Sequence, residues 1–170
     1  MKIIEAMKKV KANKEKILDL QRLILSNAAH LSIETPMYAD ADTRVRGWAQ
    51  ACEDLARDNV ALLTSIARTN LATKVTIDLD GQPVTKTIAE WVWRRREYAQ
   101  LDMTTWSHMN DRNLKEGKAA SSTGVDLEIK IVRHYDPATR DAKIARYKGE
   151  PHAIDAALEV VNATTDLVTA

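Results

Sequence analysis

The chain has 170 residues, of which 45% are hydrophobic and 29% are charged, a balance typical of a folded domain and not of a disordered segment. Its 25 Lys and Arg nearly cancel its 24 Asp and Glu, so the chain lacks the positive field typical of nucleic-acid-binding proteins. No apolar run approaches the roughly 18 residues of a membrane span, and the N-terminus lacks the apolar core of a signal peptide, so we expect no nucleic acid, no membrane and no signal-directed export.

Two long helices open the predicted fold. Apolar residues recur every three or four positions over residues 2–31, and a second series with the same spacing follows within residues 40–71. This spacing places one apolar stripe along each helix and predicts an antiparallel helical hairpin over residues 2–71. The two series are Ile3, Ala6, Val10, Asn13, Ile17, Leu20, Ile24, Asn27 and Leu31, then Val45, Trp48, Cys52, Leu55, Asn59, Leu62 and Ile66.

The pattern then changes to the two-residue alternation of a β-strand. Val75, Ile77 and Leu79 alternate with polar residues, and Asp80-Gly81 supplies the positive-φ residues of a tight turn. We expect a β-hairpin over residues 74–85, followed by a helix over residues 88–114.

The last third of the chain begins with small polar residues. Residues 115–124 predict a mobile loop, and the alternation over residues 125–134 predicts a strand that pairs with the earlier hairpin. Asp136-Pro137 is typical of a helix start, so a helix over residues 137–168 follows, kinked near Pro151. The predicted fold is a mainly α single domain of residues 1–170, in which four long helices form an antiparallel bundle with a β element of two or three strands.

The most unusual local composition is the segment Trp91–Tyr98, which holds three arginines beside aromatic residues. Consecutive helical residues differ by about 100° around the axis, so the three arginines cannot form one basic face for nucleic acid. Tryptophan and arginine are enriched at protein interfaces, and we predict a protein-contact surface at Trp91, Trp93, Arg94 and Arg96. Arg95 lies on the predicted inner side of the helix and is expected to enter a buried ion pair.

Other motifs favour structural readings. The sequence Asp78-Leu79-Asp80-Gly81 resembles part of a calcium loop but lacks its closing glutamate, so we interpret it as a hairpin turn. The four histidines do not have the spacing of a helical zinc pair, and Cys52 on the apolar stripe is typical of a buried thiol. We predict no catalytic residues, no metal and no cofactor, and hence a protein that is not an enzyme.

Short motifs spread over most of the chain resemble one family. They read MKxxEA at residues 1–6, IARTNLAT at 66–73, GxxVTKTIA at 81–89, LEIK at 127–130 and VNATT at 161–165. Together they resemble the small helical proteins called septicolysin-like, or DIP1984-like, including phage-encoded members. The resemblance to phage-encoded members implies a virion structural protein, whereas the family name implies a pore-forming cytolysin.

We therefore expect a non-enzymatic structural or interaction protein, most simply an accessory bacteriophage virion protein that cements or decorates the capsid. Its expected partners are a second copy of itself, as a dimer or higher oligomer, and a phage capsid protein. It would be assembled into the virion in the host cytoplasm. A tail or neck component of the virion and a membrane-active cytolysin are the alternatives that the sequence leaves open.

Overall fold

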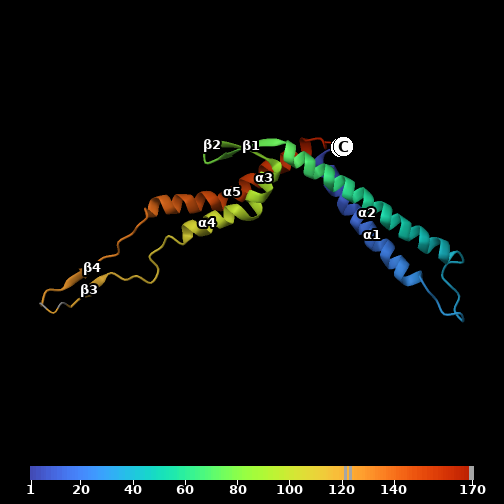
Figure 1. The fold of residues 1–170 in the computed structure, drawn as a ribbon, viewed down its shortest axis with the longest axis horizontal. Coiled ribbons are helices and arrows are strands. Elements are labelled where there is room, and N and C mark those ends of the chain that lie inside the picture. The colour runs from blue at the N-terminus through green and yellow to red at the C-terminus, as the bar shows by residue number, and fades with distance from the viewer. Residues whose placement is uncertain (121, 123, 169–170) are drawn as a thin grey trace. The chain divides into compact units, whose positions relative to one another are not determined.

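The computed structural model describes residues 1–120, 122 and 124–168. The protein is mainly helical, with two small antiparallel sheets of two strands each (Figure 1). The chain divides into two compact units. The first holds Met1–Val75, Thr87–Ala89 and the C-terminal residues from Leu158, and the second holds Thr76–Lys86 and Glu90–Ala157.

The first unit is built on a helical hairpin of α1 (Ile3–Asn27) and α2 (Ala41–Ala72), which lie side by side (Figure 1). The first four positions of the predicted α1 stripe are the buried residues of this helix, namely Ile3, Ala6, Val10 and Asn13. Leu31 was expected to continue the stripe but lies beyond the end of α1 and is exposed. In the last turn of the helix, the side chains of Ser26 and Asn27 donate to the carbonyls of Arg22 and Leu23.

The C-terminal residues close the base of the hairpin. The amide of Ile3 donates to the carbonyl of Thr165 over 3.1 Å, and the amide of Val168 donates to the Thr69 hydroxyl over 2.9 Å. Lys2 forms an ion pair of 2.7 Å with Asp166. These contacts join the first turn of α1, the last turn of α2 and the end of the chain, so they fix where the hairpin begins.

The β-hairpin of β1 (Lys74–Leu79) and β2 (Gln82–Thr87) confirms the sequence prediction. Along β1, Val75, Ile77 and Leu79 are buried and their neighbours are exposed. At the turn, Asp80 and Gly81 both have positive φ, of 57° and 79°. The amide of Gly81 donates to the Asp78 carboxylate over 2.6 Å, so the acidic residues here shape a turn, as the sequence predicts.

One interrupted helix follows the hairpin. It consists of α3 (Ile88–Trp93), the π-helical segment η1 (Arg94–Tyr98) and α4 (Ala99–Ser107). The amide of Ala99 donates to the carbonyl of Arg94, five residues back. The helix was expected to reach residue 114 but ends at Ser107, where the Asn110 amide donates to the carbonyls of Ser107 and His108.

The second sheet corrects two predictions. The strand expected over residues 125–134 is limited to β4 (Leu127–Ile129), and it pairs with β3 (Gly117–Ala119) and not with the β1–β2 hairpin. The predicted loop of residues 115–124 therefore contains a strand, which its small residues concealed, and Ser121 and Thr123 of this loop lie outside the described residues. The described residues form four strands in two separate sheets, where two or three strands were expected.

The last helix is α5 (Pro137–Thr164). Its start confirms the prediction, because the Asp136 carboxylate accepts a hydrogen bond of 2.9 Å from the amide of Thr139. The helix continues through Pro151, so residues 137–164 form one element. Across the described residues, no helix of the protein is long and apolar enough to cross a membrane.

Candidate functional site

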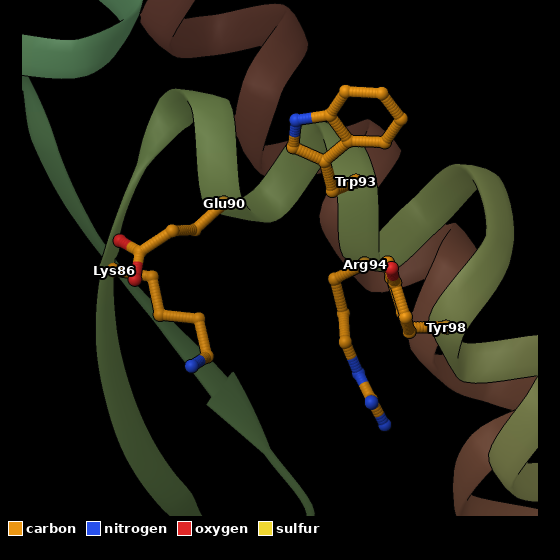
Figure 2. A pocket seen from close by; sticks show the side chains of 5 residues that line it. All are labelled: Lys86, Glu90, Trp93, Arg94 and Tyr98. Carbon is orange, nitrogen blue, oxygen red and sulfur yellow. The ribbon is translucent and has the colours of Figure 1, made fainter.

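Around η1, the second unit presents an open pocket with a volume of about 450 Å³. Lys86 of β2 lies on one wall, and Glu90, Trp93, Arg94 and Tyr98 of the interrupted helix supply the rest (Figure 2). Trp93 is 57% exposed and Tyr98 is 51% exposed, so two aromatic side chains reach solvent within one and a half helical turns. In Figure 2 the indole of Trp93 points away from the guanidinium of Arg94.

Arg94 is held by two carboxylates. Its Nε and Nη2 donate to both oxygens of Glu150 over 2.5 and 2.9 Å, and its Nη1 donates to Asp102 over 2.5 Å. The guanidinium also lies 5.3 Å from the ring centre of Tyr147. Hydrogen bonding to Glu150 raises the pKa of Arg94 above its ordinary high value, so this side chain remains a cation. Glu150 itself is buried, and a bidentate pair of this kind holds both side chains in one geometry.

Arg94, and not the expected Arg95, makes the ion pair with a buried carboxylate. Arg94 lies three residues after the buried Trp91, and the π-helical hydrogen bond from the amide of Ala99 to the Arg94 carbonyl places the buried Ala99 on the same face. Arg95 instead pairs with Asp155 over 2.6 Å, and its side chain is partly exposed while that of Asp155 is exposed. Arg95 therefore forms an ion pair, but not the buried one that the sequence predicts.

The four predicted contact residues separate by exposure. Trp93 and Arg96 are exposed, and Arg94 is largely covered by its ion pairs. Trp91 has no exposed surface, so it belongs to the core and we remove it from the contact surface. The alternation that separates the two tryptophans follows from their spacing, because residues two apart on a helix point to different sides.

The arrangement suits recognition of a protein surface. Two exposed aromatic side chains line the same pocket as the ion-paired Arg94, and Lys86, which lies 6.0 Å from the centre of the Trp91 ring, adds a second cation. Aromatic and arginine side chains supply contact area and directional hydrogen bonds at protein interfaces. Within residues 1–120, 122 and 124–168, no group of three or more His, Cys, Asp or Glu side chains is placed to hold a metal ion.

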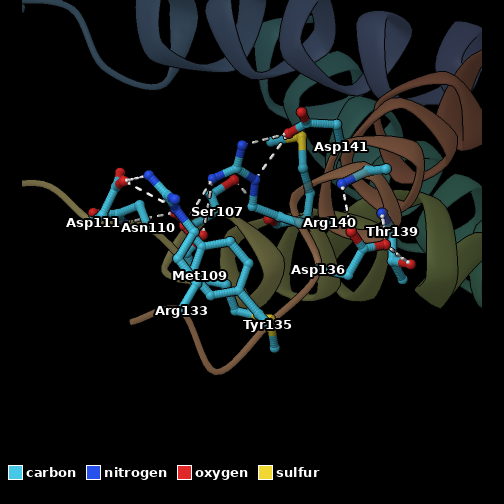
Figure 3. A network of polar contacts seen from close by, with 12 residues as sticks. Ser107, Met109, Asn110, Asp111, Arg133, Tyr135, Asp136, Thr139, Arg140 and Asp141 are labelled. Carbon is cyan, nitrogen blue, oxygen red and sulfur yellow. Dashed lines mark hydrogen bonds and ion pairs between the residues drawn. The ribbon is translucent and has the colours of Figure 1, made fainter. Parts of the chain in front are cut away.

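A second polar cluster was not predicted from the sequence (Figure 3). It ties the end of α4 to the start of α5 on either side of the β3–β4 segment. Arg133 forms an ion pair with Asp111, and Arg140 donates to the carbonyl of Met109 over 3.1 Å and stacks near Tyr135. The hydrogen bond from Arg133 lowers the pKa of Asp111. Partners 22 and 31 residues apart carry no periodic signal, so sequence patterns could not reveal them.

The β3–β4 segment also exposes aliphatic side chains. Leu127, Glu128 and Ile129 are all exposed although β4 pairs with β3, so neither face of this short strand is covered. Alternation along a sequence indicates a strand, but it does not show whether a core lies against one face.

Comparison with known proteins shows a fold relationship. No known protein family matches the chain, and no curated protein matches it. One solved structure matches with a TM-score of 0.58 and 20% sequence identity over 99% of both chains: a functionally unknown conserved protein from Corynebacterium diphtheriae. This neighbour is consistent with the DIP1984-like resemblance, and its description names neither a phage nor a cytolysin. At this identity the match establishes the fold alone.

Proposed function

We propose that this chain is a non-enzymatic protein that works by binding other protein surfaces, including a second copy of itself as a dimer or higher oligomer. The observation that carries the proposal is the pair of exposed aromatic residues, Trp93 and Tyr98, which line one pocket with an Arg94 held by two carboxylates. A side chain fixed before binding loses little conformational entropy when a partner docks, which favours association.

Within this class we propose an accessory bacteriophage virion protein that cements or decorates the capsid. The support is the family resemblance of the short motifs, together with a surface suited to protein contact.

The presence of the chain in virus particles tests the virion proposal. Cells that carry the gene are induced to release particles, which are then banded in a density gradient and analysed by quantitative mass spectrometry. The proposal predicts that the chain bands with the major capsid protein at a fixed ratio. A chain found only in the soluble lysate contradicts it.

The contact surface is tested separately on purified particles stripped of the chain. Trp93→Ala and Arg96→Ala are expected to reduce rebinding about 10-fold or more, since truncation of an interface aromatic or arginine commonly costs more than 1 kcal/mol. Gln100→Ala is the matched control, because Gln100 is exposed on the adjacent turn outside the pocket. Equal rebinding by all three variants would contradict the proposal that Trp93 and Arg96 contact the particle.

A further inference from the structure

A second apolar stripe runs along the α1–α2 hairpin, beside the stripe that joins the two helices. On α1 each member directly follows a residue of the first stripe, as Leu18 follows Ile17 and Leu25 follows Ile24. We call this second stripe the lateral face. Its apolar members are Ile4, Met7, Leu18 and Leu25 on α1, and Ala49, Ala56, Val60, Leu63 and Ala67 on α2, and exposed polar residues interrupt it at Lys11, Lys14, Gln21, Arg46 and Glu53.

The two halves of the lateral face lie on the same side of the hairpin. On each helix they are displaced from the first stripe by about 100° in the same rotational sense. Since α1 and α2 run in opposite directions and their first stripes face each other, equal rotations turn both second stripes to one side. Exposure agrees with this geometry, because Leu18 is 54% exposed, Leu25 84% and Val60 65%.

The opposite side of the hairpin has a different composition. It is polar over most of its length. Among the described residues of α1 and α2 on that side, Leu23 is the one large exposed aliphatic residue, with 38% of its surface exposed. Its members are Glu5, Lys9, Ala12, Lys16, Asp19 and Leu23 on α1, and Asp54, Asp58, Ala61, Ser65 and Arg68 on α2. The helix pair is therefore apolar on one side and polar on the other, which is the pattern of helices that pack against a further layer on their apolar side.

The first stripe also lacks full cover toward the loop that joins α1 and α2. Ile17, Leu20 and Ile24 continue the buried series of α1 but remain partly exposed, as do Trp48 and Cys52 across from them. Two helices alone cannot surround a stripe that lies between them, so a further layer is needed to complete its burial.

The area of the lateral face is that of a dimer interface. A helix of 25 residues is about 37 Å long, and two helices side by side are about 20 Å wide, which gives roughly 700 Å² for each copy. Two such faces bury about 1,400 Å² in total, within the range of stable, specific protein interfaces.

The area favours a second copy as the occupant, because in a two-fold dimer one surface serves both partners. The charged residues at the same helical positions, Lys11, Lys14, Arg46 and Glu53, are all exposed.

We propose that two copies of the chain pack their lateral faces together and form an intermolecular four-helix bundle. The inference rests on the proposed self-association and assigns a surface to it.

The test is the solution mass of the purified full chain by sedimentation velocity over a range of concentrations. The wild type is expected to be dimeric, and Leu18→Glu or Val60→Glu is expected to weaken the dimer about 100-fold or more, because each dimer carries the change twice. Leu23→Glu and Ala61→Glu are the matched controls on the opposite side and are expected to leave the dimer intact.

The outcomes separate the surface from self-association itself. A monomeric wild type overturns both. A dimeric wild type in which lateral-face and control variants dissociate equally, or not at all, overturns the lateral face and leaves self-association standing. Circular dichroism accompanies each variant. If a lateral-face glutamate variant loses helicity, Leu18→Ala and Val60→Ala replace it, and dimers unchanged by both alanines overturn the assignment.

Discussion

The amide Nδ2 of Asn13 donates to Oδ1 of Asn59 over 3.0 Å, and this hydrogen bond lies buried between α1 and α2. Each asparagine interrupts an otherwise apolar stripe in its own helix. Sliding one helix by a turn would place either amide against aliphatic side chains, so the pair favours one alignment of the hairpin.

The pair predicts a strong coupling between two substitutions. Asn13→Leu or Asn59→Leu alone leaves one buried amide without its partner, which is expected to lower the free energy of unfolding by about 1–3 kcal/mol. The double variant restores an apolar contact and is expected to recover most of this loss. A double-mutant cycle by urea unfolding measures the coupling, and additive losses contradict the account.

The stripes on α1 and α2 could be predicted because they depend on local spacing. Residues such as Val10 and Asn59 occupy their predicted inner positions, and the turn at Asp80-Gly81 has the predicted backbone. These features follow from hydrophobic periodicity and from the φ that a residue type tolerates, and both can be read along the chain.

The candidate site could be predicted only in part. The segment around Trp93 is recognisable from composition, but the π-helical segment η1 departs from the regular helical period, and the partner of Arg94, Glu150, lies 56 residues away. The pairing of β3 with β4 likewise joins a segment of Gly, Lys and Ala that has no strand pattern of its own. Such features are set by tertiary contacts, which spacing does not encode.

The neighbouring arginines of η1 are expected to differ in their effect on stability. Arg94→Met leaves the buried Glu150 without its bidentate partner, so a loss of about 3 kcal/mol is expected. Arg95→Met removes a pair between a partly exposed arginine and an exposed carboxylate, so the expected loss is below about 1 kcal/mol. Chemical denaturation of both variants compares them, and equal losses would show that the pair with the buried Glu150 stabilises the fold no more than the pair with Asp155.

The two tryptophans of α3 are expected to show the same contrast. Trp91 is wholly buried, and Trp91→Ala is expected to destabilise the protein by about 3–5 kcal/mol. Trp93 is mostly exposed, and Trp93→Ala is expected to cost below about 1 kcal/mol. Thermal unfolding separates the two, and a large loss for Trp93→Ala would place that side chain in the core instead of on a contact surface.

The ion pair of Lys2 with Asp166 predicts a dependence on pH. Hydrogen bonding from Lys2 lowers the pKa of Asp166 below its ordinary value of 3.8. A lowered pKa in the folded state means that the contribution to stability is present above pH 3.8 and is lost as the pH falls through the lower, folded-state value. Asp166→Asn is expected to remove this part of the acid sensitivity.

Hydrogen exchange at the amides of Ile3 and Val168 provides the measurement, since both join the chain ends. Protection in the wild type should fall between pH 4 and pH 2 relative to Asp166→Asn, after correction for intrinsic exchange. Identical profiles for the two proteins would mean that Asp166 does not hold the chain ends together.

The most direct test of the whole account is an experimentally determined structure of the assembled wild-type protein. We predict that Leu18, Leu25, Val60 and Leu63 of one copy are buried against the lateral face of a second copy, and that Trp93 stays exposed for a further partner. An assembly in which these four side chains remain in solvent would contradict the central claim.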